Sequence, residues 1–190
     1  MIAMKKKAKE MKFRRRREAL TNYAKRVAMV KGGLERVVVR ESNTRIIAQV
    51  VAYDEKGDRI MTSADSRELA KLGWPGRCNR PTAYLTGRLL AKKADKKNEY
   101  ILDIGLSTPV KGSIPFVFAK GCVDGGMHIK GTFDIKEETY DASSISKYAE
   151  MLKKDQSRYA LQFGAYAKEK VQPEGLQKLF TEVKAKIGKA

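Results

Sequence analysis

The chain has 190 residues, with 40 lysines and arginines against 22 aspartates and glutamates, a formal net charge of +18 and an isoelectric point near 9.9. This length suits one domain with a hydrophobic core and extensions, and it is short for two domains. Such a positive charge favours a polyanion as the partner, nucleic acid first. No apolar run approaches the roughly 18 residues of a membrane span, so we expect no membrane contact.

The positive charge is concentrated at the two ends. Residues 1–33 contain 12 basic and 2 acidic side chains and residues 151–190 contain 9 and 4, so the middle of the chain is nearly neutral. Residues 1–12 are rich in lysine, and we expect them to be disordered without a partner. The predicted organisation is a basic N-terminal arm and RNA-binding helix over residues 1–33, an α/β core over 34–142, and a basic helical C-terminal extension over 143–190.

The cysteines and the N-terminus indicate the compartment. Cys78 and Cys122 are the only cysteines and are far apart in the sequence, unlike the close pairs of zinc sites or small disulfide scaffolds. The basic N-terminus lacks the apolar segment of a secretory signal. We therefore expect a soluble cytoplasmic protein with reduced thiols.

The first predicted element begins at Arg14. Apolar side chains from Leu20 to Val30 recur every three or four positions, which predicts one continuous helix that Gly32 and Gly33 end. Residues 34–66 follow with three runs of β-forming residues, separated by Ser-Asn and Lys-Gly-Asp turns. They predict a three-stranded antiparallel meander.

The rest of the core alternates helices with one strand. Residues 66–73 predict a short helix, and Pro81 opens a long one. Residues 99–106 predict a buried strand and residues 114–123 an apolar helix. The order of elements predicts an α/β fold, a mixed sheet with helices packed on it. After Ser143 the pattern predicts three helical segments, the last with an apolar face that needs a partner.

Catalytic chemistry has little support. His128 is the only histidine, which excludes histidine triads and multi-histidine metal sites and predicts a structural or RNA-facing role. No phosphate-binding glycine motif is present. Asp103 lies in a predicted buried strand, where a carboxylate most often accepts hydrogen bonds from loop amides. The alternative is a metal-dependent RNA-processing nuclease that uses Asp103 with Asp54 or Asp58.

Residues 74–80 combine aromatic and basic side chains, which are candidates for nucleic-acid contacts. Trp74 is more typical of a core residue than of a base-stacking platform. Arg77 and Arg80 are the better candidates for contacts.

Four consecutive arginines, Arg14–Arg17, give the strongest indication of function. On a helix they spread over more than about 270°, because each residue advances about 100°. Such a ring of guanidinium groups is useful where phosphates surround the helix end. Structured RNA fits better than duplex DNA, since no helix-turn-helix, zinc-finger or leucine-zipper pattern occurs. A free RNA chaperone with weakly binding tails is a further alternative.

Five ordered motifs resemble one family. These motifs are "FRRRREALTNYAKR", "VVVRESNTRIIAQVV", "GDRIMTSADSREL", "GWPGRCNRPTAYLTGRLLAKKA" and "LDIGLSTPVKGS". They are similar to the archaeal and eukaryotic form of large-subunit ribosomal protein eighteen. The match runs from about Phe13 to Tyr148. The resemblance implies a noncatalytic sheet of ribonuclease-H-like topology, no cofactor and no metal. It also implies binding to 5S rRNA and to the large rRNA in the central protuberance, beside neighbouring ribosomal proteins.

The resemblance also implies RNA-contacting positions, which it places in three groups. The first element contributes Phe13, Arg14, Arg15, Arg16, Arg17, Thr21, Tyr23, Lys25 and Arg26. The turn after the first strand contributes Arg40, Ser42, Asn43 and Arg45. The later motifs contribute Ser63, Ser66, Arg67, Arg77, Asn79, Thr82, Thr86, Lys111 and Ser113.

The chain departs from the family pattern at two places. Ala19 and Leu20 replace a Gly-Lys pair that is common in the family, and Asp65 stands where a histidine is usual. An aspartate that faced phosphate would be repelled by it.

Overall fold

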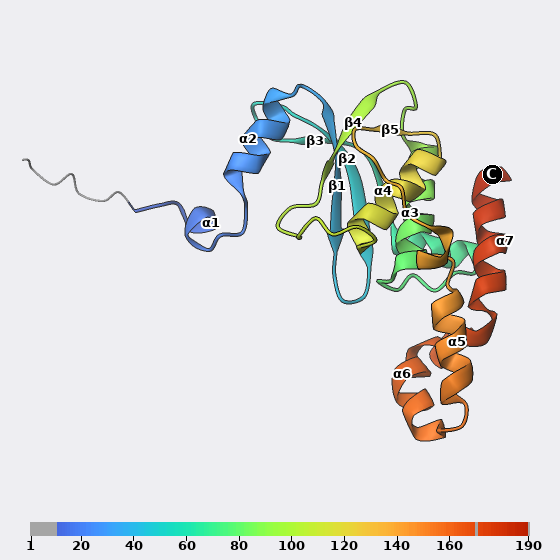
Figure 1. The fold of residues 1–190 in the computed structure, drawn as a ribbon. Helices are drawn as coiled ribbons and strands as arrows, with labels where there is room; N and C mark the ends of the chain where they lie inside the picture. The colour runs from blue at the N-terminus through green and yellow to red at the C-terminus, as the bar shows by residue number, and fades with distance from the viewer. Residues whose placement is uncertain (1–10, 170, 190) are drawn as a thin grey trace, which may run out of the picture.

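The computed structural model describes residues 11–169 and 171–189, so most of the segment predicted to be disordered lies outside the described residues. Its centre is a five-stranded sheet with the strand order β3-β2-β1-β4-β5 (Figure 1). The strands are β1 (Glu35–Glu41), β2 (Ile46–Ala52), β3 (Arg59–Asp65), β4 (Glu99–Asp103) and β5 (His128–Ile129). The predicted α/β mixed sheet is confirmed.

The strand directions follow from the connections. Short turns join β1 to β2 and β2 to β3, and both pairs are antiparallel, which confirms the predicted meander. β4 follows a helical crossover and pairs with β1 in parallel, and β5 pairs with β4 in parallel. The sequence pattern does not predict β5, because a strand of two residues has no periodicity to detect.

Two helices cover one face of the sheet. α3 (Arg80–Lys93) and α4 (Ile114–Asp124) pack against alternate buried residues of β1 and β2, such as Val37 and Ile46. The two helices cross closely at a pair of glycines. A Cβ atom on Gly87 would lie 2.2 Å from the carbonyl oxygen of Phe118, so only glycine allows this approach.

The short helix after β3 is a 3-10 helix, η1 (Ser66–Leu72). Asp65 and Glu68 form a capping box at its start, and Gly73 ends it with a φ of 88°. The next residue, Trp74, is buried, and its Nε1 donates to Thr82 Oγ1 at 2.8 Å. The prediction of Trp74 as a core residue is therefore confirmed.

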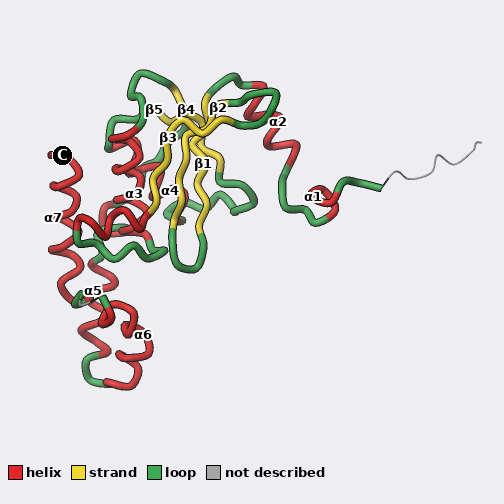
Figure 2. The backbone as a smooth tube through the Cα atoms, turned by 180° about the vertical axis from the view of Figure 1, so that it is seen from behind, coloured by secondary structure: helices red, strands yellow, loops and turns green. Residues whose placement is uncertain are grey.

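Three helices follow a 3-10 turn, η2 (Glu137–Thr139), near the C-terminus. They are α5 (Ser143–Leu152), α6 (Gln156–Lys168) and, after the turn η3 (Pro173–Gly175), α7 (Leu176–Lys189). The apolar face of α7 packs on α3, and Phe180 contacts the rings of Trp74 and Tyr84. The predicted partner of that face is thus the core itself. α5 and α6 form a hairpin that extends away from the sheet (Figures 1 and 2).

The N-terminal helix is broken, which corrects the prediction of one continuous helix. α1 (Arg14–Arg17) is a single turn, and α2 (Tyr23–Lys31) starts after a linker. Ala19 adopts a φ of 50°, the left-handed region, and the Asn22 side chain accepts from Lys25 N at 3.1 Å. A residue with positive φ ends a helix and Asn is a strong N-cap, so local chemistry overrides the apolar periodicity.

The predicted apolar stripe of this segment is largely exposed. Leu20 is 53 % and Val27 is 50 % exposed, whereas Met29 and Val30 are half-buried. α1 and α2 lie on the opposite side of the sheet from α3, α4 and α7 (Figure 2). None of the helices in residues 11–169 and 171–189 combines the length and apolar character that crossing a membrane requires.

Both cysteines are free thiols, as their spacing predicts. Cys122 is fully buried in α4, and burial raises the pKa of its thiol well above the ordinary value. A thiol with a raised pKa reacts slowly, so Cys122 acts as a small core residue.

Candidate nucleic-acid interface

The four arginines of α1 are all exposed. Since the helix has only one turn, their side chains leave it in four directions. Arg14 Nε pairs with Glu18 at 2.9 Å, and Arg15 Nε donates to Thr21 Oγ1 at 2.6 Å. Phe13 precedes the helix and is 90 % exposed. This single turn presents a dense group of cations beside one exposed aromatic ring.

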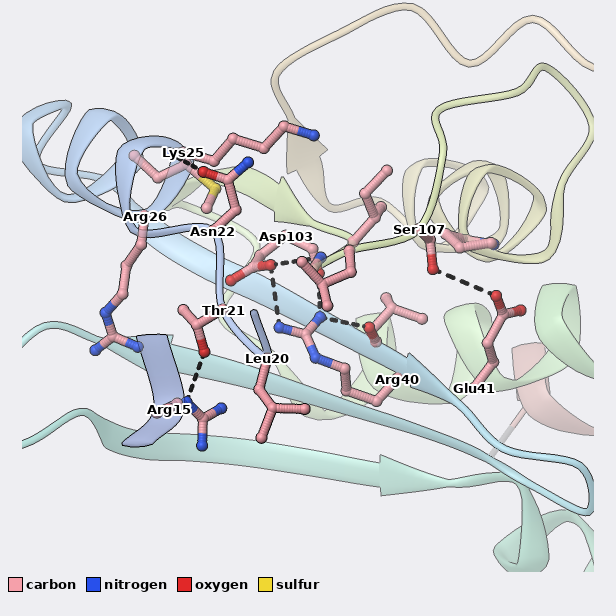
Figure 3. Close-up of a pocket in the computed structure, with 16 residues that line it drawn as sticks. Arg15, Leu20, Thr21, Asn22, Lys25, Arg26, Arg40, Glu41, Asp103 and Ser107 are labelled. Carbon is pink, nitrogen blue, oxygen red and sulfur yellow. Dashed lines mark hydrogen bonds and ion pairs between the residues drawn. The ribbon is translucent and has the colours of Figure 1, made fainter. Parts of the chain in front are cut away.

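A cavity of about 310 Å³ lies where the α1–α2 linker faces the carboxyl ends of β1 and β4 (Figure 3). Four of its lining residues are cations from three elements, namely Arg15, Lys25, Arg26 and Arg40. Its other walls come from the linker and from residues 104–107 after β4. The N-terminal elements and the end of β1 therefore share one hollow with residues 103–107, which lie far along the chain, and its lining also includes the carboxylates of Glu41 and Asp103.

Behind this cavity, arginines and aspartates alternate in a network whose centre, Arg36 and Asp103, is buried. Arg36 on β1 is 2 % exposed, and its Nη1 donates to Asp103 Oδ2 at 3.2 Å. Its Nη2 lies 2.7 Å from Asp58 Oδ2, which also accepts from Arg26 Nη2 at 2.8 Å. Arg40 Nη2 in turn donates to Asp103 Oδ1 at 3.1 Å. The network runs from Arg26 on α2 to Arg40 at the end of β1.

The charges in this network lower the pKa of the Asp58 carboxyl. Burial by itself raises the pKa of the Asp58 carboxyl. The contact with Arg36 and the charge of Arg26 more than offset burial, so this pKa lies below its ordinary value. Asp58 is therefore ionised at neutral pH and acts as the counter-charge of both arginines.

The same contacts bear on the nuclease alternative. Asp103 accepts from the Gly105 amide at 2.8 Å, as expected for a buried carboxylate beside a loop, and it also binds two arginines. Asp58 binds arginines as well, and Asp54 Oδ1 accepts from Lys56 N at 3.1 Å in the hairpin turn. Within the part of the chain that the structure describes, no three His, Cys, Asp or Glu side chains group as metal ligands. These contacts give the nuclease alternative no support.

The β1–β2 turn closes on itself and remains exposed. Ser42 Oγ donates to Arg45 O at 3.0 Å and accepts from Arg45 N at 3.1 Å, which leaves the Asn43 side chain in solvent. Arg45 pairs with Asp65 at 3.5 Å. Asp65 thus has two partners inside the protein, the start of η1 and Arg45, which explains an aspartate at this position.

A second hollow, of about 440 Å³, lies beside η1 and contains Arg67 and Arg77. Arg67 is exposed, whereas Arg77 Nη2 donates to Ala165 O at 3.0 Å and pairs with Glu169 at 2.7 Å. Its guanidinium also lies 5.8 Å from the centre of the Tyr166 ring. Arg77 therefore holds α6 on the core.

Three of the expected contact residues have buried side chains. Ser66 Oγ donates to Gly76 O, Thr82 Oγ1 accepts from Trp74, and Thr86 Oγ1 donates to Thr82 O at 2.7 Å. Their hydroxyls hold the loop after η1 and the start of α3, so we leave them out of the proposed surface.

The other expected positions lie on or near the surface. Asn79 Oδ1 accepts from Thr82 N at 3.0 Å and so caps α3. The remaining residues, Ser63, Lys111 and Ser113, lie on β3 and in the loop before α4. Ser113 lines a third hollow together with Arg80. His128 is exposed at the start of β5.

The sequence interpretation missed Arg36. A charged residue inside a run of β-forming residues was the available signal, because such a residue is buried only when it is paired. Its partners come from a hairpin turn and a distant strand, and spacing in the sequence does not reveal them.

The fold and this surface define a class of protein: a small basic α/β domain whose exposed cations surround a cavity and suit a polyanion. A model of the family described as ribosomal large subunit proteins 60S L5 and 50S L18 matches residues 7–100, about half of the chain. The chain belongs to this family, which gives it a structural role in the large ribosomal subunit. The match covers α1, α2, the three strands of the meander and α3. It therefore includes all four cations that line the cavity, from Arg15 to Arg40.

Proposed function

We propose that the protein binds 5S rRNA and helps to attach it to the large rRNA in the central protuberance. The observation that carries the proposal is the placement of four exposed arginines of α1 beside a cavity lined by four cations. The choice of 5S rRNA follows from the sequence resemblance. Family membership supports an RNA partner within the large subunit.

The broken helix supports this role physically. Because the chain turns at Ala19, α1 stands away from the sheet instead of continuing the axis of α2 (Figure 1). RNA that lies between α1 and the β1–β2 turn meets guanidinium groups from both sides. Each guanidinium donates a fork of N–H groups to phosphate oxygens, and the exposed rings of Phe13 and Tyr23 can stack on unpaired bases.

The compact sheet acts as a platform for these groups. α3 and α4 cover its far face and α7 packs on α3, so the side of the sheet that carries α1 and α2 is left to contact RNA. We propose that the three parts of the chain, a basic N-terminal element, an α/β core and a basic C-terminal extension, have different functions. In this proposal the C-terminal α5–α6 hairpin reaches other large-subunit components, such as neighbouring ribosomal proteins.

Filter binding tests the proposal with 5S rRNA and an unrelated structured RNA of equal length. We expect tighter binding of 5S rRNA and no magnesium-dependent cleavage of either RNA. Equal affinities would contradict the specific function and favour a free RNA chaperone. Cleavage that is lost in Asp103→Asn would instead favour the nuclease.

A further inference from the structure

Two surface arginines are held in place by acidic residues beneath them. Arg26 comes from α2 and Arg40 from the end of β1, and both line the cavity of Figure 3 with about half of each side chain exposed. Asp58 binds the first and Asp103 the second. Buried Arg36 lies between the two aspartates and contacts both.

The arrangement restricts both guanidinium groups. Arg40 uses one nitrogen, Nη1, to donate to Val39 O at 2.7 Å and to Asp103 O at 2.9 Å, while Nη2 meets the Asp103 carboxylate. Arg26 has a single carboxylate contact, at 2.8 Å. An arginine side chain has many rotamers, and fixing it before binding removes part of the entropy loss on binding.

We infer that Asp58 and Asp103 are positioning residues for RNA binding, which fix Arg26 and Arg40 in the orientation that meets RNA phosphates at this cavity. The inference rests on the proposed function and adds two acidic residues to it. It makes an unusual prediction of sign: removing a negative charge from a protein that binds RNA weakens the complex. Charge alone predicts the reverse, because a lost carboxylate strengthens attraction to phosphate.

A double-mutant cycle on the full chain separates positioning from a general structural role. Asp58→Asn, Arg26→Ala and the double variant are compared with wild type by filter binding of 5S rRNA at fixed salt. We expect Asp58→Asn to raise Kd about three- to tenfold in the wild-type background, the range for ordering one side chain. In the Arg26→Ala background, the same substitution should leave Kd unchanged or lower it slightly.

Asp54→Asn is the matched control. Asp54 lies in the same hairpin turn, carries the same charge, and contacts the backbone of Lys56 instead of an arginine. We expect this variant to bind RNA as wild type does or slightly more tightly. Thermal unfolding of every variant shows whether the fold is intact.

Each result decides the inference. Unchanged or tighter binding by Asp58→Asn, or equal weakening with and without Arg26, would overturn it. If Asp58→Asn does not fold, the corresponding cycle of Asp103→Asn with Arg40→Ala applies the same criteria. Equal binding of 5S rRNA and a control RNA by wild type would remove only the proposed specificity, since the cycle can be read on either RNA. No RNA binding by wild type would overturn both proposals.

Discussion

Neutralising the arginines of α1 tests the N-terminal contact directly. In a variant with Arg14–Arg17 replaced by glutamine, the exposed turn stays short and polar but loses four charges. Because consecutive residues point about 100° apart, four guanidinium groups do not all face one RNA surface. Arg14 is also partly compensated by Glu18 at 2.9 Å. We therefore expect the loss of about two phosphate contacts instead of four.

The size of the effect follows from counterion release. Each phosphate contact adds about 0.7 to 0.9 to the slope of log affinity against log salt concentration. Losing two contacts flattens the slope by about 1.4 to 1.8. Between 50 and 200 mM salt, the loss of affinity should then be about tenfold smaller for the variant than for wild type. Filter binding of 5S rRNA across this salt range measures the difference.

A control variant removes the same charge elsewhere. Lys147, Lys153, Lys154 and Arg158 are exposed on the α5–α6 hairpin, far from α1 in both views of the fold. Replacing these four residues by glutamine should change the slope by less than the value of one phosphate contact, about 0.7 to 0.9. An unchanged slope in the α1 variant, or an equal change in both variants, would refute the assignment of the contact to α1.

Three further predictions concern the platform. Phe180→Ala removes a buried ring between Trp74 and Tyr84 and should cost about 3–5 kcal/mol in the free energy of unfolding, measured with urea. Gly87→Ala should cost at least about 2 kcal/mol in the same assay, because its Cβ would meet a backbone carbonyl of α4 at 2.2 Å. Asp58 has a pKa below its unfolded value, so its contribution to stability is present at neutral pH and is lost as pH falls through the folded value. The difference in unfolding free energy between wild type and Asp58→Asn should therefore shrink below about pH 4.

The sequence predicts most of the sheet because its signals there are local. Alternating β-forming residues and two turns with Gly or Asn define the meander, and Pro81 and Gly73 mark helix ends where the structure has them. The sequence does not predict β5, because its two residues form a strand only by pairing with the neighbouring strand β4. Its existence depends on the crossover through α4, a tertiary feature.

The N-terminal element shows how a periodic pattern misleads. Leu20 and Val27 follow helical spacing, yet both are exposed and the helix breaks between Arg17 and Tyr23. The family's usual glycine at position 19 was a relevant signal, since the structure gives Ala19 a positive φ that glycine adopts without strain. The side-chain pattern alone does not reveal this backbone conformation.

The sequence predicts the cations of the candidate surface, but it does not predict that carboxylates hold some of them in place. A count of charges treats every arginine alike, but the fold separates them into two groups. Arg36 and Arg77 are bound to carboxylates inside or between elements, whereas the arginines of α1 remain on the surface. The carboxylates that suggest metal ligands in the sequence, Asp58 and Asp103, pair with buried Arg36 and also with Arg26 and Arg40 at the cavity. We expect these carboxylates to orient the cations beside them, so a change in one of them can alter RNA binding without touching RNA.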